Sequence, residues 1–368
     1  MRNDSRLKHV QYYERRQSRV ARKLGRSKFD TLLITQLADI RYLCGFTGSS
    51  AVLVLTRDDA AFFTDGRYSE QAHTEVVGAA NVIIEGNPLR RALQWSQESK
   101  ARCLGLDFAH ISVSLFQQVQ QQFGGRVKLE DCSGMVQSFR MIKDEQEITR
   151  IRGAVKLGAE LFSTALESIR PGVPESRVAA EMEYEARRRG GEGMSFETIV
   201  AGGTRSALPH GRASHARLPR RGFVVLDFGV ILTGYCSDMT RTVHLGKTDA
   251  RERRMYDAVL RAQLAAIRKV RPGVGVSVVD AAARETLDRA GFGQFFTHST
   301  GHGVGLEVHE PPRIAGKQRQ KLQPGMVITV EPGVYIPGEG GVRIEDMVLV
   351  TDSGCEVLTP TTKKLITI

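Results

Sequence analysis

The sequence predicts two domains, an α/β domain over residues 1–140 and an α+β domain with an internal repeat over residues 141–368. A chain of 368 residues is longer than one hydrophobic core usually serves, so two domains are the default expectation. The first part alternates short apolar runs with helix-like segments, whereas the second part opens on one long helical pattern. The second part also contains the same four-residue turn twice, which indicates a duplication.

Short β-branched and apolar runs identify the strands of the first domain. Residues 31–35, 51–55 and 61–64 have the composition of strands, and turn-forming residues follow the last of them. Residues 89–95 and 112–123 have the pattern of helices. The alternation predicts an α/β domain that ends near residue 140.

The second domain is predicted to begin with a long helix over residues 144–169. Apolar side chains, among them Ile148, Ile151 and Val155, recur there at helical spacing. The turn Arg170-Pro171-Gly172-Val173 follows this helix.

The same turn recurs as Arg271-Pro272-Gly273-Val274. The first copy precedes a predicted helix over 174–189, and the second lies between predicted helices over 250–270 and 277–290. Each copy leads into a stretch rich in glycine and histidine and then into a pair of strands. Two halves with the same order of elements predict a duplicated domain related by a pseudo-twofold axis.

Composition excludes several protein classes. Hydrophobic residues make up 41% and charged residues 25%, which is typical of a globular protein, and no apolar run approaches the length of a membrane span. The N-terminus has no apolar signal-peptide core, and the five scattered cysteines predict free thiols, so we expect a cytoplasmic protein. The net charge of +11 raises the question of nucleic acid, but no binding motif accompanies it, and a solvated basic surface is the better expectation.

Four acidic residues lie inside or at the end of apolar runs. Asp227 and Asp238 belong to two successive strand-like runs, and a turn at Leu232-Thr233 would set them opposite each other. Glu331 and Glu345 have the same relation in the second half, around a loop centred on Pro337-Gly338. Buried like charges are costly without a cation between them. The four carboxylates therefore predict a site for two divalent ions.

The stretch Thr297 to Glu310, THSTGHGVGLEVHE, carries three histidines on a glycine-rich backbone. The glycines exclude a helix, so this segment is predicted to be extended or looping, with backbone that can approach a crowded centre. One imidazole can join the four acids as a metal ligand, while the others can contact a substrate.

Five segments in order resemble the pita-bread metallopeptidases, which include methionine aminopeptidase, Xaa-Pro aminopeptidase and prolidase. They are SFETIVAGGTRSALPH, LDFGVILTGYCSDMTRT, HSTGHGVGLEVHE, VITVEPGVY and VRIEDMVLV. The junction Arg140-Met141-Ile142-Lys143-Asp144, followed by Glu147, resembles the proline-specific members. The N-terminal segments RYLCGFTGSSAVLVL and FFTDGRY resemble their creatinase-like N-terminal domain. The resemblance implies the creatinase-like and pita-bread folds for the two domains.

The resemblance also implies a set of site residues. Asp238 and Glu345 would bridge two ions, Asp227 would complete one coordination sphere, and His302 and Glu331 would complete the other. A water acidified by the two ions would attack the carbonyl before proline, with Glu331 carrying the proton to the leaving nitrogen. The remaining implied residues line the substrate side: His210 and His309, which would stabilise the oxyanion, together with His298 and Arg343.

Alternatives stay open for some of these residues. His210 could be an exposed loop histidine, and Arg343 could be only a salt-bridge partner for a carboxylate. Cys236 is expected to be a buried, inert thiol and Tyr235 a packing residue. Two departures from the family pattern, Glu307 in place of aspartate and the sequence at 204–206, concern the substrate side.

The favoured function is hydrolysis of the bond between an N-terminal residue and proline, as a dipeptidase or an aminopeptidase. Alternatives are specificity of the methionine aminopeptidase type, creatinase-like hydrolysis without metal, and a catalytically inactive pita-bread module that binds protein or nucleic acid. The basic charge favours the last, whereas the complete ligand set opposes it. Oxygen-rich ligation with one imidazole suits Mn²⁺ or Co²⁺, with Zn²⁺ as a further candidate. A homodimer is expected from the resemblance.

Overall fold

The computed structural model describes residues 2–84 and 86–368. The chain divides into two compact units, Met1–Ser138 and Phe139–Ile368. The sequence-based boundary lies two residues further on, after residue 140. The division falls inside the short helix α6 (Gln137–Arg140).

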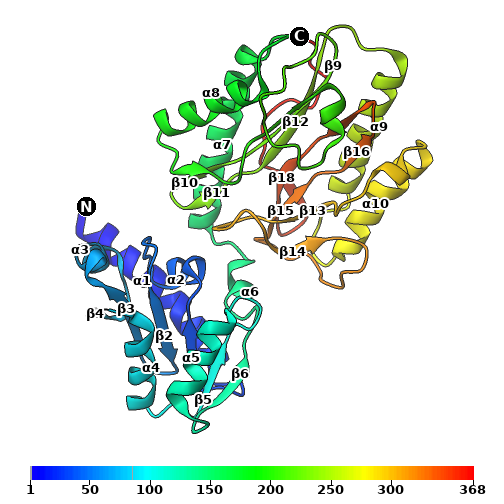
Figure 1. Ribbon diagram of the computed structural model, residues 1–368. Coiled ribbons are helices and arrows are strands. Elements are labelled where there is room, and N and C mark those ends of the chain that lie inside the picture. Colours follow the sequence, from blue (N-terminus) through cyan, green and yellow to red (C-terminus); the bar gives the residue numbers. More distant parts are fainter. Residues whose placement is uncertain (1, 85) are drawn as a thin grey trace. The chain divides into compact units, whose positions relative to one another are not determined.

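The first unit is a six-stranded sheet with helices packed on it (Figure 1). The strand order is β4-β3-β2-β1-β5-β6; β1, β5 and β6 run parallel, as do β3 and β4, and β2 is antiparallel to both of its neighbours. Its elements are α1 (Arg2–Leu24), β1 (Thr31–Ile34), α2 (Leu37–Cys44), β2 (Val52–Thr56), β3 (Ala60–Asp65), α3 (Ser69–Glu75), β4 (Ala80–Ile84), α4 (Pro88–Glu98), β5 (Cys103–Leu106), α5 (Val113–Phe123) and β6 (Lys128–Asp131).

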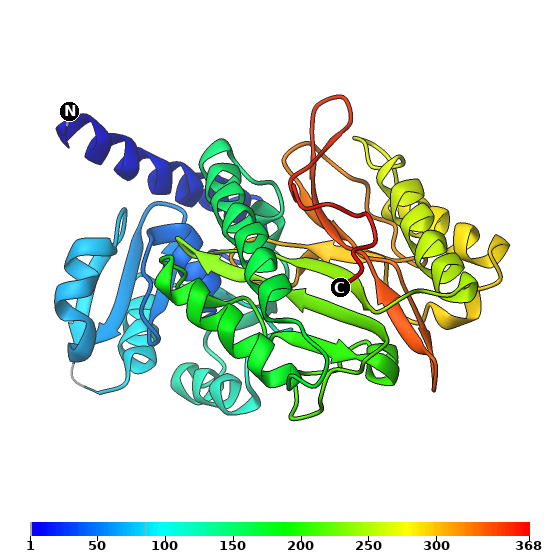
Figure 2. The same cartoon turned by 90° about the horizontal axis from the view of Figure 1, so that it is seen from above.

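The second unit consists of two similar halves. In the first half, α7 (Glu145–Ser168) and α8 (Glu175–Arg188) pack against a sheet of order β12-β9-β8; in the second, α9 (Ala250–Ile267) and α10 (Val276–Arg289) pack against a sheet of order β14-β13-β15-β18-β19. Figures 1 and 2 show one helix pair on each flank of the strands. The strands are β7 (Gly193–Met194), β8 (Ile199–Gly202), β9 (Gly222–Phe228), β10 (Val230–Leu232), β11 (Tyr235–Cys236), β12 (Met239–Leu245), β13 (Gly301–Gly303), β14 (Glu310–Ile314), β15 (Val327–Val330), β16 (Gly333–Ile336), β17 (Gly340–Arg343), β18 (Asp346–Val350) and β19 (Cys355–Val357).

Equivalent hydrogen bonds in the two halves confirm the predicted duplication. The amide of Gly172 donates to the carbonyl of Leu218 at 2.8 Å, and the amide of Gly273 donates to that of Leu322 at 2.9 Å. Leu218 and Leu322 donate back, to Val173 and Val274, each at 2.9 Å. Each RPGV turn is therefore hydrogen-bonded to the segment that leads into a central strand of its own half, β9 in the first half and β15 in the second.

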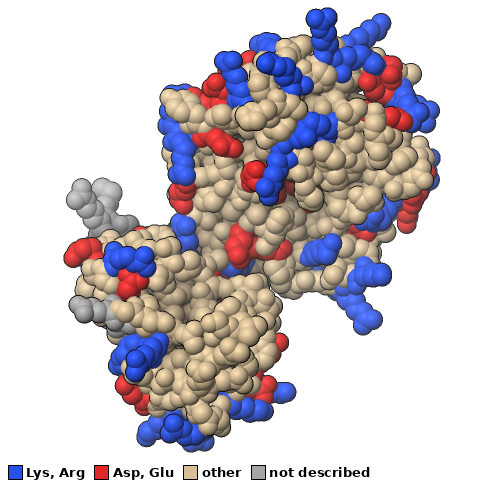
Figure 3. Space-filling view, in the orientation of Figure 1, with Lys and Arg blue, Asp and Glu red and all other residues tan. Residues whose placement is uncertain are grey.

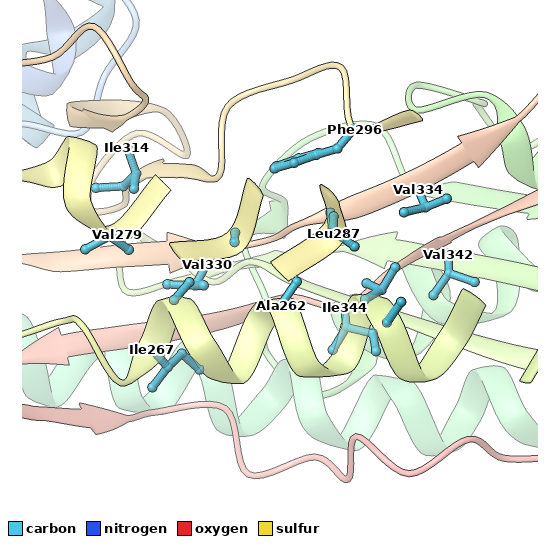
Figure 4. Packing of buried hydrophobic residues seen from close by; sticks show 14 of the residues in the cluster. Ala262, Ile267, Val279, Leu287, Phe296, Ile314, Val330, Val334, Val342 and Ile344 are labelled. Carbon is cyan, nitrogen blue, oxygen red and sulfur yellow. The ribbon is translucent and has the colours of Figure 1, made fainter. Parts of the chain in front are cut away.

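Each half has its own apolar core. In the second half, Ala262 and Ile267 of α9 and Val279 and Leu287 of α10 pack against side chains of the strands, such as Val330 (Figure 4). The first half buries a corresponding cluster between α7, α8 and the β9–β12 ladder. The strands that carry or adjoin the four predicted acids are thus packed between the two helix pairs.

The visible surface of the second unit carries charges of both signs (Figure 3). Figure 3 shows Lys and Arg interspersed with Asp and Glu over the visible face of the second unit. Among residues 2–84 and 86–368, none of the helices combines the length and the apolar character that crossing a bilayer requires. All five cysteines are free thiols, and burial raises the pKa of Cys236 to about 11.

Candidate metal centre and substrate cavity

The first pair of acids lies on the β9–β12 ladder. Asp227 pairs with Thr240, and Asp238 directly precedes β12, so the two aspartates are diagonal neighbours rather than directly opposed. The predicted turn at Leu232-Thr233 is wrong by one residue, because β10 and β11 are joined by Thr233-Gly234. Both turn residues have positive φ, 49° and 82°, which is the requirement of the tight turn that joins twisted strands.

The second pair of acids lies between β15 and β18. Val330 pairs with Asp346, and one further step in the same register places Glu331 opposite Glu345. The pairing of β16 with β17 continues this register around a loop at Gly338, as predicted. The hydroxyl of Thr240, on β12 of the first half, donates to Glu345 Oε2 at 2.7 Å. The acids of the two halves therefore meet at one centre.

His302 faces these acids from β13. The imidazole Nδ1 lies 3.0 Å from the carbonyl oxygen of Gly303, so Nδ1 carries the proton and Nε2 presents a lone pair. Nε2 is 3.3 Å from Glu331 Oε1 and 3.6 Å from Asp238 Oδ2. Burial lowers the pKa of His302, which keeps the ring neutral. A lone pair directed at two carboxylate oxygens is the arrangement that a cation between them would stabilise.

Three of the candidate ligands already converge. Asp238, His302 and Glu345 each offer one ligand atom, and these atoms lie within 4.8 Å of one another. Burial, reinforced by the neighbouring carboxylates, raises the pKa of Asp238 and of Glu345 well above the usual range. Burial likewise raises the pKa of Glu331 to about 7. Negative charge in this cluster is unfavourable without a counter-ion, so the donor set fits divalent cations.

Asp227 links this cluster to a buried arginine. Arg343 Nη2 donates to Asp227 Oδ2, while Asp227 Oδ1 is buried with no hydrogen-bond partner in the described part of the chain. Besides the convergence of Asp238, His302 and Glu345, this buried acceptor without a partner also fits a cation beside Asp227. Arg343 is thus the salt-bridge partner of a carboxylate, and it also faces the cavity.

Tyr335 connects Arg343 to His298. His298 Nδ1 lies 2.8 Å from the Ser299 carbonyl, so its Nε2 accepts the Tyr335 hydroxyl at 2.9 Å. The same hydroxyl accepts from Arg343 Nη1 at 2.6 Å. Burial lowers the pKa of His298 to about 4 and raises the pKa of Tyr335 to about 12, so both groups are neutral at pH 7.

One cavity of about 880 Å³ is lined by all nine of the predicted site residues. His309, on the exposed side, stacks edge-on against His302 with ring centroids 4.3 Å apart, and burial lowers its pKa. His210 is an exposed loop residue, as its sequence context suggested, but it also borders the cavity. The remaining walls include the apolar side chains of Phe196 and Ile199.

Several residues that support this site were missed at the level of sequence. Tyr335 stands in the VEPGVY segment and contacts His298, and Thr240 follows Asp238 and contacts Glu345. A tyrosine or a threonine gives no sign in the sequence of a partner that is distant along the chain. The two departures from the family pattern make contacts outside the cavity wall: Glu307 binds Arg140, and Arg205 binds Glu175. Tyr235 is buried as expected, and its hydroxyl donates to Glu147 at 3.0 Å.

Comparisons with known proteins agree with the geometry. The family model of metallopeptidase family M24 matches residues 149–352, and the model of the creatinase/prolidase N-terminal domain matches residues 16–142. A Xaa-Pro dipeptidase of Pyrococcus horikoshii is 34% identical over 93% of this chain and 96% of its own length. The structure of a Xaa-Pro dipeptidase from Bacillus anthracis superposes with a TM-score of 0.92 at 38% identity, covering 98% of this chain and 100% of that one. An X-Pro aminopeptidase from Thermotoga maritima gives a TM-score of 0.87 at 36% identity, covering 95% and 100%.

Proposed function

The chain belongs to metallopeptidase family M24, and from this premise we propose that it hydrolyses the bond between an N-terminal residue and proline. The observation that carries the proposal is one cavity that is lined by two acids from each half of the second unit, and in which acids of both halves lie close to the unprotonated Nε2 of His302. Relatives with the same two domains are named Xaa-Pro dipeptidase and X-Pro aminopeptidase, so this chain is proposed to act on Xaa-Pro dipeptides or on longer peptides with proline second.

Two divalent cations would be held by Asp227, Asp238, His302, Glu331 and Glu345. When bound, such ions polarise a carbonyl and lower the pKa of a water. Mn²⁺ is the proposed metal, ahead of Co²⁺ and Zn²⁺, because four of the five donors are carboxylates and only one is an imidazole.

The protein groups around the cluster would divide the remaining work. His309 and His210, at the cavity wall, would donate hydrogen bonds to the oxyanion that develops on the scissile carbonyl. The carboxylate of Glu331 would take a proton from the attacking water and deliver it to the proline nitrogen, which has no hydrogen of its own and leaves as a secondary amine.

His298 and Arg343 would fix the substrate side of the cavity. Tyr335 holds both side chains through one hydroxyl, so their ring and guanidinium planes are oriented before substrate enters. Phe196 and Ile199 offer an apolar wall that suits the pyrrolidine ring of proline.

A substrate panel tests the proposal. Metal-stripped protein would be supplied with Mn²⁺, Co²⁺ or Zn²⁺ and offered Ala-Pro, Ala-Pro-Ala, Met-Ala-Ala and creatine. We expect turnover of Ala-Pro, of Ala-Pro-Ala or of both, and its loss with chelator. Turnover of Met-Ala-Ala alone would overturn the proline specificity, and undiminished activity in chelator would exclude the metal mechanism.

The homodimer and the cytoplasmic location stay predictions, and light scattering would test the homodimer.

A further inference from the structure

The segment that opens the second unit buries two cationic side chains. Arg140, the last residue of α6, is 2% exposed, and Lys143, shortly before α7, is 4% exposed. Burying a cation is unfavourable unless a partner compensates for its lost hydration. Neither residue lines the cavity or has a role in the proposed chemistry, so their burial needs another explanation.

Both cations converge on one buried carboxylate, that of Glu310. Lys143 Nζ donates to Glu310 Oε2 at 3.1 Å, and Arg140 Nη2 donates to Glu310 Oε1 and, at 2.7 Å, to Glu307 Oε2. The amide of Glu307 also donates to Glu310 Oε1. Burial acts to raise the pKa of Glu310, but Lys143 and Arg140 outweigh it and hold that pKa below its usual value. The carboxylate is therefore ionised and fixed at both oxygens.

Glu310 has little room to move. A methyl group added at Gly305 would come within 2.6 Å of Glu310 Oε2, so the carboxylate lies directly on the backbone of the glycine-rich segment. Glu310 also pairs with Gly303 in the β13–β14 ladder. The contacts of Glu310 thus close the loop between β13 and β14 and set the backbone on which His309, the preceding residue, stands.

The same opening segment contacts the other half of the site. Glu147, in the first turn of α7, accepts the hydroxyl of Tyr235 at 3.0 Å. Tyr235 lies in β11, three residues before Asp238. The residues from Arg140 to Glu147 therefore brace the histidine segment on one side and the strand leading to Asp238 on the other.

We propose that Arg140 and Lys143 are positioning residues that hold the ring of His309 in place through Glu310. The inference rests on the proposed function, because it assigns His309 a contact with the reacting carbonyl. It gives the RMIKD junction a part in catalysis that its distance along the chain from the histidines does not suggest.

Lys143→Met is the principal test, because methionine keeps an unbranched side chain, one atom shorter, and removes the charge. We expect kcat/KM to fall about 10- to 100-fold, mainly through kcat, as is typical when a supporting hydrogen-bond partner is lost. Lys143→Arg, which retains the charge, should keep most of the activity. The matched control is Arg152→Gln in α7, which removes an ion pair whose partner Glu356 is 44% exposed, and it should leave kcat unchanged.

A mutant cycle and a measurement without substrate separate positioning from mere stability. In a Glu310→Gln background, Lys143→Met should cause no additional loss of kcat, whereas equal losses in both backgrounds would overturn the proposal. In metal-free protein, Lys143→Met should increase amide hydrogen exchange several-fold over residues 303–314 but not over α9. Unchanged exchange there would equally overturn it. If the unmodified protein were inactive, the proposed function would be refuted instead. The exchange experiment would still show whether Arg140 and Lys143 hold the segment around Glu310 in place.

Discussion

The two halves of the second unit have the same backbone arrangement but contribute different side chains to the cavity. The RPGV turns make the same hydrogen bonds in both halves, and each half places two acids in, or directly beside, neighbouring strands. The second half alone adds His298, His302, His309 and Arg343, whereas the first half adds His210 from a loop. The two halves thus share the backbone and the pairs of acids, whereas four of the five other candidate site residues in the cavity come from the second half.

The largest effect should come from removing one acid from each half. We expect Asp238→Ala, from the first half, and Glu345→Ala, from the second, each to lower kcat by at least about 10³-fold, because a cation site with an incomplete set of charges loses its electrostatic function. Calorimetric titration with Mn²⁺ should show loss of uptake in both variants. An unchanged rate in either variant would refute the ligand assignment, and a large difference between the two would show that the halves do not contribute equally.

A smaller effect concerns the stability of the metal-free protein. The pKa of Glu331 is raised to about 7 from the 4.5 of a free glutamate, so between these values the folded state binds a proton that the unfolded state has lost. Stability should therefore fall as pH rises from about 5 to 7, by an amount on the order of 3 kcal/mol. Asp238 and Glu345 are shifted in the same direction and should add to the slope.

Thermal melts at pH 5 and pH 8, with chelator and with Mn²⁺, check this slope. Bound metal should restore the stability lost at pH 8, because cations compensate the carboxylates that face one another from the two halves. Glu331→Gln should flatten the metal-free profile. A metal-free protein that becomes more stable toward pH 8 would contradict the view that the two halves bring uncompensated acids together.

The residues that meet in the candidate site could be named from the sequence because the signal at each position is local. An acid inside or at the end of an apolar run, as at Asp227 or Glu331, is costly where the run is buried, so four such acids together predict a cation site before any contact is known. Contacts between distant residues leave no such mark. The register of β9 with β12 follows from the two residues that form the turn between β10 and β11. One of them is Thr233, and a threonine with positive φ is unusual, so the sequence did not identify this turn.

Helix α1 could not be predicted from the spacing of apolar residues in the sequence. Its buried face includes Arg16 and Gln17 beside Tyr12, Val20 and Leu24, so the apolar periodicity is interrupted. These polar side chains are satisfied by carbonyl groups of α2, because Arg16 Nη1 donates to Tyr42 at 3.0 Å and Gln17 Nε2 to Leu43 at 2.9 Å. A helix whose buried face depends on such partners cannot be identified from hydrophobic spacing alone.

The smallest effect is expected from the two RPGV turns. Gly172 and Gly273 have nearly the same φ, +82° and +81°, and a methyl group added at either would meet no atom within 4 Å. Alanine at each position is therefore penalised only by its left-handed backbone, by about 1–2 kcal/mol. We expect Gly172→Ala and Gly273→Ala to lower Tm by similar amounts and to leave kcat unchanged. Gly354→Ala, where φ is not in that region and space is open, is the matched control and should melt like the unmodified protein. Backbone strain should cost the same at both turns. Unequal decreases in Tm would therefore show that the hydrogen bonds of the two turns contribute differently to stability.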